Sequence, residues 1–97
     1  MQTLDEIRDT LKKHKEEVIR DYKVKELGIF GSVVRGEQGR RSDIDILVEY
    51  SELPDLLKLI ELERLLQRIL RKKVDLVEKS GIRPELRDRI LNEVVYI

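Results

Sequence analysis

Residues 24–50 read VKELGIFGSVVRGEQGRRSDIDILVEY, and this pattern predicts two strands joined by a turn, a short helix and a polar loop. The first strand, over residues 24–30, ends at Gly31-Ser32, where a glycine favours a turn. A short helix is expected at residues 32–37, before a loop of glycines and charged residues. The second strand, from Asp43 to Tyr50, is mostly apolar. The stretch therefore predicts a strand–loop–strand unit with polar residues around its turn.

Further helices and strands are expected on both sides of this unit. Apolar residues at helical spacing predict helices at residues 3–21, at 54–71 and from about Pro84, while residues 74–77 predict a third strand and 94–97 an extended end. The helix over 54–71 has an apolar face wide enough to leave part of it for a protein interface. This order of elements predicts a small α/β (α+β) layer fold in a single domain spanning residues 1–97.

The composition excludes several classes of function. With 20 basic and 20 acidic residues in 97, the chain has no net charge, and this balance disfavours binding to extended nucleic acid through its phosphates. The absence of cysteine excludes disulfides and thiolate metal sites. No 18-residue apolar stretch or signal peptide is visible, so we expect a cytoplasmic protein with no membrane association.

Three aspartates are candidate metal ligands. Asp43 and Asp45 are two residues apart on the second strand, so their side chains point to one face with Cα atoms roughly 6.6 Å apart. If the third strand lies beside the second, Asp75 brings another carboxylate to the same place. Such a cluster needs a compensating cation, and all-oxygen ligands near phosphates favour Mg²⁺, with two ions roughly 3.5–4 Å apart.

Asp75 is expected inside a buried apolar strand, VDLV, where an unpaired carboxylate is costly. The alternative to a metal ligand is a structural salt bridge with a basic neighbour such as Arg71 or Lys73.

The Gly31-Ser32 turn is the candidate phosphate site. A residue without Cβ lets the backbone approach a polyphosphate, and the Ser32 hydroxyl either binds a phosphate oxygen or caps the following helix. Arg35 lies one turn into that helix, where it either grips the same anion or is solvated. Arg41 or Ser42, at the end of the loop, could add contacts. The alternative for the whole motif is an ordinary strand-to-helix turn.

The run Gly31-Ser32-x10-Asp43-x-Asp45, preceded by an apolar strand and followed by Val74-Asp75-Leu76-Val77, resembles the minimal nucleotidyltransferases of the DNA polymerase beta superfamily. This resemblance implies a polymerase beta-like nucleotidyltransferase fold, a small mixed sheet with flanking helices. It also implies that Asp43 and Asp45 bind two Mg²⁺ ions, and that Asp75 helps the catalytic ion to activate an attacking hydroxyl. Gly31 and Ser32 would hold the triphosphate of ATP.

The small stand-alone members of that family resemble antitoxins whose partner is a helical HEPN-domain ribonuclease, and some transfer AMP from ATP to a tyrosine of that toxin. The resemblance therefore implies a Mg²⁺-dependent protein adenylyltransferase with a HEPN toxin as its partner. Two alternatives stay open: an antitoxin that acts by binding alone, and nucleotidyl transfer to RNA or a small molecule. The sequence also leaves a homo-oligomer open. It offers no room for a separate nucleic-acid-binding domain, which disfavours templated polymerisation.

Overall fold

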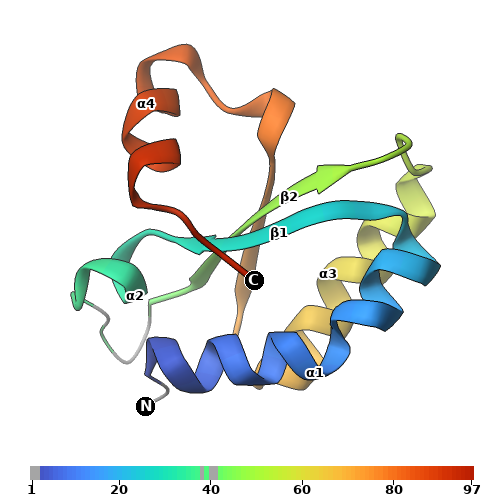
Figure 1. The fold of residues 1–97 in the computed structure, drawn as a ribbon, viewed down its shortest axis with the longest axis horizontal. Helices are drawn as coiled ribbons and strands as arrows, with labels where there is room; N and C mark the ends of the chain where they lie inside the picture. Colours follow the sequence, from blue (N-terminus) through green and yellow to red (C-terminus); the bar gives the residue numbers. More distant parts are fainter. Residues whose placement is uncertain (1–2, 38, 40–41) are drawn as a thin grey trace.

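A computed structural model describes residues 3–37, 39 and 42–97 of the chain. Figure 1 shows their arrangement. In chain order the elements are α1 (Leu4–Tyr22), β1 (Val24–Phe30), α2 (Ser32–Arg35), β2 (Ile44–Tyr50), α3 (Leu56–Leu70), β3 (Val74–Glu78), the 3₁₀ turn η1 (Lys79–Gly81), α4 (Pro84–Glu93) and β4 (Val95–Tyr96). The predicted helices and strands are confirmed within a few residues, and η1 is an addition that the sequence did not suggest.

The strands form one mixed sheet in the order β3-β2-β1-β4. β1 runs antiparallel to β2 and to β4, whereas β2 and β3 are parallel. The sequence prediction that the third strand lies beside the second is therefore confirmed. In this register Asp45 and Asp75 are direct partners, and directly paired residues present their side chains on the same face of a sheet.

Helices cover the two faces of the sheet differently. Figure 1 shows α1 and α3 on one side and α4 on the other. The larger core lies under α1 and α3, where the β2 residues Ile44, Ile46 and Val48 meet buried side chains of both helices. On the opposite face Leu47 packs in a smaller cluster with residues that include those of α4. Because side chains alternate along a strand, Asp45 shares the α4 face with Leu47.

The apolar face of α3 divides into two parts. The second half of the helix is core: Leu62, Leu66 and Leu70 are fully buried. The helix begins at Leu56 because the Asp55 side chain accepts the backbone N–H of Lys58 at 2.9 Å and caps it. Large apolar side chains that stay exposed around this end are Leu53, Leu56, Leu57 and Ile60. Three of them, Leu56, Leu57 and Ile60, belong to the predicted apolar face, and an interface on this face stays a prediction. No helix within the described ranges is both long and apolar enough to cross a membrane.

Candidate active site

The sheet brings the predicted aspartates together on its α4 face. Asp45 lies in β2 opposite Asp75 in β3, and Asp43 immediately precedes β2. Asp45 and Asp43 are half-buried, but Asp75 is exposed. The prediction of Asp75 inside a buried strand is thus wrong, because β3 is the outer strand of the sheet. Among the described residues no ion pair joins Asp75 to Arg71 or Lys73.

Electrostatic coupling shows that these carboxylates act on one another. The pKa of Asp45 is raised to about 6, first by burial and then by the negative charges of Asp75 and Asp43, while the positive charge of Arg35 opposes the shift. An uncompensated carboxylate pair of this kind attracts a cation.

The three aspartates offer the right donor atoms for a metal ion, but their side chains do not form a closed set of ligands. The oxygen donors of the three aspartates suit a hard divalent cation. As the side chains lie, however, no three acidic, histidine or cysteine residues in the described part of the chain converge enough to hold an ion. Because Mg²⁺ is usually bound by one or two carboxylates together with substrate phosphates and water, Asp43 and Asp45 fit an ion whose coordination phosphates and water complete.

Gly31 brings the turn after β1 directly against Asp45. Its backbone angles are φ 81° and ψ −153°, a region that is open essentially to glycine alone. A Cβ atom at this position would overlap the Asp45 carboxylate, with Cγ at 2.9 Å. A glycine is thus needed twice here, for the backbone conformation and for the approach of the carboxylate.

Ser32 is the first residue of α2 and does not cap it. Gly31 is the N-cap, without a side-chain hydrogen bond, so the alternative in which the Ser32 hydroxyl caps the helix is wrong. The helix simply begins one residue too early for that role. In the part of the chain that the structure describes, no hydrogen bond to the Ser32 hydroxyl is found, which leaves it available for a ligand.

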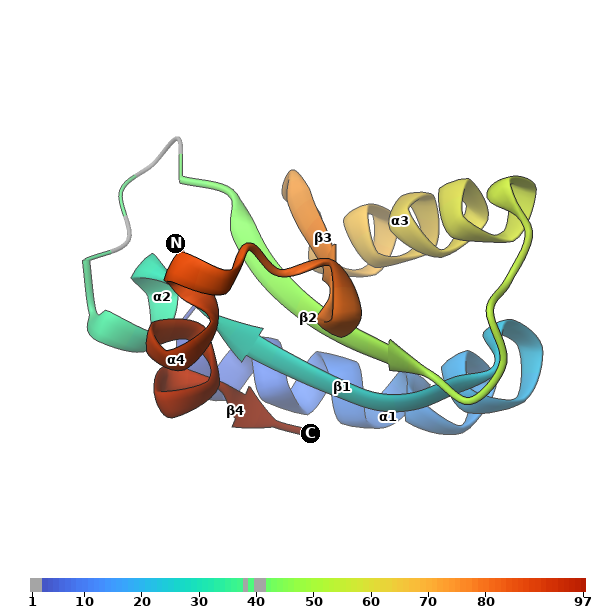
Figure 2. The ribbon, with the colours of Figure 1, turned by 90° about the horizontal axis from the view of Figure 1, so that it is seen from above.

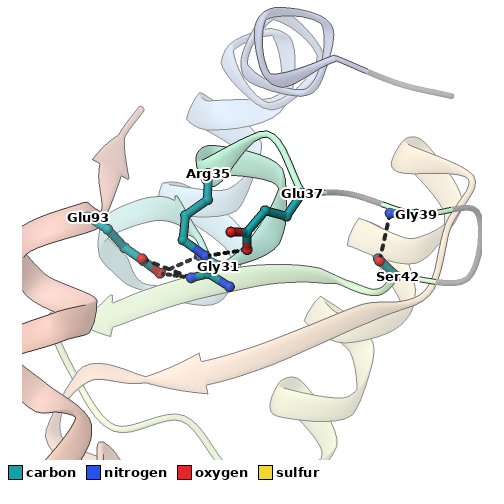
Figure 3. A network of polar contacts seen from close by, with 6 residues as sticks. All are labelled: Gly31, Arg35, Glu37, Gly39, Ser42 and Glu93. Carbon is teal, nitrogen blue, oxygen red and sulfur yellow. Dashed lines mark hydrogen bonds and ion pairs between the residues drawn. The ribbon is translucent and has the colours of Figure 1, made fainter.

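Glu93, at the end of α4, is a member of the site that sequence reasoning missed. Its Oε2 accepts the backbone N–H of Gly31 at 2.7 Å, and its two oxygens accept hydrogen bonds from Arg35 Nη1 at 2.9 and 3.0 Å. Arg35 Nε also donates to Glu37 at 2.9 Å (Figure 3). Arg35 is therefore held by two carboxylates and is not a freely solvated side chain. No local signal marks Glu93, because its partners lie about 60 residues away and only the fold unites them.

The loop residues are less closely tied to the site. The backbone N–H of Gly39 donates to Ser42 Oγ at 2.9 Å, and Figure 3 shows this pair apart from the Arg35 cluster. A contact between Ser42 and phosphate stays a prediction. Arg41, the other predicted contact, lies outside the described residues.

A cavity of about 180 Å³ opens between the Gly31 turn and α4. The residues that line it are Phe30, Gly31, Arg35, Asp45, Leu86, Arg89, Ile90 and Glu93. The Asp45 carboxylate and the backbone of Gly31 thus face one space, with apolar side chains of α4 on its other wall. A cavity so lined suits a ligand that joins phosphates to an apolar or aromatic group.

Residues 11–97 match the model of the nucleotidyltransferase domain family. The chain belongs to this family. This nucleotidyltransferase is 48% identical, over 97 residues, to the protein adenylyltransferase MntA of Thermococcus cleftensis, covering 100% of this chain and 98% of that protein.

Solved structures agree with the fold. A provisionally assigned minimal nucleotidyltransferase matches with a TM-score of 0.82 and 32% identity, over 97% of this chain and 95% of that one. A toxin–antitoxin complex with AMP-PNP contains a chain that matches with a TM-score of 0.70 and 29% identity, over 88% of this chain and 70% of that one. The polymerase beta-like fold expected from the motif is therefore confirmed.

Proposed function

We propose that this nucleotidyltransferase transfers AMP from ATP to a hydroxyl group of a partner protein and thereby silences that partner. The observation that carries the proposal is the placement of Asp45 opposite Asp75, with the Gly31 turn against the Asp45 carboxylate. The name of the Thermococcus cleftensis relative, protein adenylyltransferase, supports the choice of reaction and of a protein acceptor.

The proposed reaction is an in-line displacement at the α-phosphorus. The acceptor oxygen forms a bond to phosphorus, the bond to pyrophosphate breaks, and the acceptor hydroxyl would pass its proton to the Asp75 carboxylate. Asp43 and Asp45 would hold Mg²⁺, which supplies charge neutralisation at the attacking and leaving oxygens. Asp75 lies exposed on the outer strand, so an acceptor could approach it from solvent. Gly31 and Ser32 would bind the triphosphate.

The proposed partner is a HEPN toxin, and the proposed acceptor is a tyrosine of that toxin. The protein would act in the cytoplasm as a single domain. A toxin–antitoxin complex among the structural neighbours, with an ATP analogue present, supports this reading. Neutralisation by binding alone is the second candidate. It is favoured by the large apolar side chains of Leu53, Leu56 and Leu57, which stay exposed around the start of α3 and offer a surface for a partner.

One experiment separates the two candidates. The protein is incubated with ATP labelled at the α-phosphate, Mg²⁺ and the HEPN-domain protein proposed as its partner. Wild type is compared with the Asp43→Asn, Asp45→Asn double variant. We expect label on the partner with wild type, and a loss of at least about a hundredfold in the variant. A stable complex that never acquires label contradicts the proposal and favours neutralisation by binding.

A further inference from the structure

Glu93 joins the end of α4 to two groups beside Asp45. Its carboxylate accepts hydrogen bonds from the Gly31 backbone and from Arg35, at 2.7 to 3.0 Å, and its side chain is only 16% exposed. Figure 3 shows the carboxylate directed at both partners. Hydrogen bonds to an ionised, partly buried carboxylate are among the stronger ones in proteins, so this contact fixes the relative position of its three members.

The turn that Glu93 holds is restrained from the helix side, where the Gly31 carbonyl accepts the backbone N–H groups of Val34 and Arg35 at 3.1 and 3.3 Å, whereas Glu93 is the acceptor for the Gly31 N–H. α2 contains four residues, Val33 is its buried side chain, and its N-cap offers no side-chain hydrogen bond. Because the Asp45 carboxylate packs against Gly31, any shift of the turn changes the space around that carboxylate. A hydrogen bond to the Gly31 N–H therefore controls how the turn meets Asp45.

The helix that carries Glu93 is itself anchored to the sheet. Ile90 and Val94 pack against a cluster that contains Phe30 and Leu47. Immediately after Glu93, β4 pairs with Gly28 and Ile29 of β1. The position of the Glu93 carboxylate thus follows from the tertiary fold and not from a flexible surface side chain.

Arg35 needs a restraint because a free guanidinium here would compete for Asp45. Its positive charge already acts on the Asp45 carboxylate, yet within the described residues its ion pairs are with Glu93 and Glu37. Glu37 is 63% exposed, whereas Glu93 is 16% exposed, so solvent screens the ion pair with Glu37 more strongly than the ion pair with Glu93. Arg35 and Asp45 line the same cavity, so without Glu93 the guanidinium would be free to turn toward the Asp45 carboxylate.

We propose that Glu93 is a positioning residue for nucleotide binding: it fixes the Gly31 turn and holds Arg35 away from Asp45. It is not a catalytic residue, because it acts through these neighbours. The inference rests on the proposed function, specifically on ATP binding at the Gly31 turn.

The test is the Glu93→Gln variant, which keeps the size of the side chain and removes its charge. Glu85→Gln is the matched control, since Glu85 is an exposed glutamate in the first turn of the same helix. AMP transfer is measured well below the melting temperature of each protein. We expect the KM for ATP to rise about tenfold in Glu93→Gln, with a smaller change in kcat, and to stay unchanged in Glu85→Gln. A merely structural role lowers the melting temperature alone, and an unchanged KM in the folded variant overturns the proposal.

A second variant covers the case in which Glu93→Gln does not fold. Glu93→Asp keeps the charge but is one methylene shorter, so it cannot reach Gly31 and Arg35 together. We expect the Gly31 amide proton, shifted downfield by its carboxylate acceptor in wild type, to move upfield in this variant. An unchanged resonance together with unchanged binding of AMP-PNP overturns the proposal, whereas an unchanged resonance with weaker binding assigns the effect to the contact with Arg35.

Direct binding of AMP-PNP with Mg²⁺, measured by calorimetry, separates failure of this inference from failure of the proposed function. If wild type binds the nucleotide but transfers no AMP, the proposed function is wrong, and weaker binding by Glu93→Gln still supports the positioning role. Equal binding by wild type and Glu93→Gln overturns the inference alone. A wild-type protein that does not bind the nucleotide overturns both.

Discussion

The ionised carboxylate of Asp45 lowers the stability of the folded protein at neutral pH. Its pKa is raised from 3.8 to about 6, with burial as the largest cause. A carboxyl group with a raised pKa binds its proton more tightly in the folded protein. Its contribution to stability is therefore fully present below the unfolded value, near pH 4, and is lost as the pH rises through about 6. In the proposed reaction, the charged form of Asp45 is the one that would bind a cation.

Replacing Asp45 by Asn should accordingly stabilise the protein at pH 8. A shift of about two units corresponds to about 3 kcal/mol, and partial exposure of the group reduces this to about 1 kcal/mol. Urea unfolding without divalent cations, at pH 8 and at pH 3.5, measures the effect, which should vanish at the lower pH. Asp9→Asn, on an exposed position of α1, is the control. A gain at pH 3.5 as large as that at pH 8 would show that the charge of Asp45 is not the cause.

At the scale of elements, α3 combines a core segment and an exposed segment in one helix. Leu66 is fully buried, whereas Leu56 is 72% exposed. We expect Leu66→Ala to lower the free energy of unfolding by about 2–5 kcal/mol, since it removes buried methyl groups and leaves a cavity. Leu56→Ala, the same chemical change on the same helix, should cost less than about 0.5 kcal/mol. Denaturant titration of both variants checks the assignment, and equal losses would contradict the placement of the helix.

The elements that sequence predicted well are those with local signals. The helix expected at residues 3–21 becomes α1, and the Thr3 side chain caps it by accepting the backbone N–H of Glu6 at 3.2 Å. The apolar run before Gly31 becomes β1 with the expected bounds. The meeting of Asp45 and Asp75 was predictable too, because it follows from strand periodicity and one assumption about strand order.

Two features of the site could not be predicted from the sequence, because they depend on where elements lie in the tertiary structure. The exposure of Asp75 follows from the place of β3 at the edge of the sheet, and the order of strands has no local signal. The contact of Glu93 with Gly31 joins residues that are 62 positions apart in the chain, and it depends on β4 pairing with β1. Since α4 has the polar residues of an ordinary surface helix, nothing in its sequence separates Glu93 from its other charged residues.

At the scale of the whole molecule, one face of the sheet carries most of the core and the other carries the candidate site. The face under α1 and α3 holds the larger core, and the α4 face holds the aspartates beside a smaller cluster. Figure 2 shows α4 and β4 next to the end of β1 that leads to α2. The last segment of the chain therefore both completes the sheet and carries Glu93 to the candidate site.

A substitution at Gly28, in β1, tests whether the position of the last segment of the chain affects the candidate site. A Cβ atom on Gly28 would lie 2.6 Å from Val94 Cγ2 and 3.3 Å from Tyr96 Cδ1. Gly28→Ala should thus push away the residue that follows Glu93. We expect a loss of about 1–3 kcal/mol in stability from overpacking, together with a raised KM for ATP in the same direction as Glu93→Gln.

Two further variants make that prediction specific. Gly81→Ala is the control, because the nearest atom that its Cβ would meet, Glu78 Oε2, is at an ordinary 3.8 Å. Adding Val94→Ala to Gly28→Ala removes the methyl group that clashes, so the double variant should regain the wild-type KM even if some packing energy is lost. Melting curves and AMP-transfer kinetics follow the two effects separately. If the double variant regains stability but keeps the raised KM, the path from Gly28 to the site does not run through Val94 and Glu93.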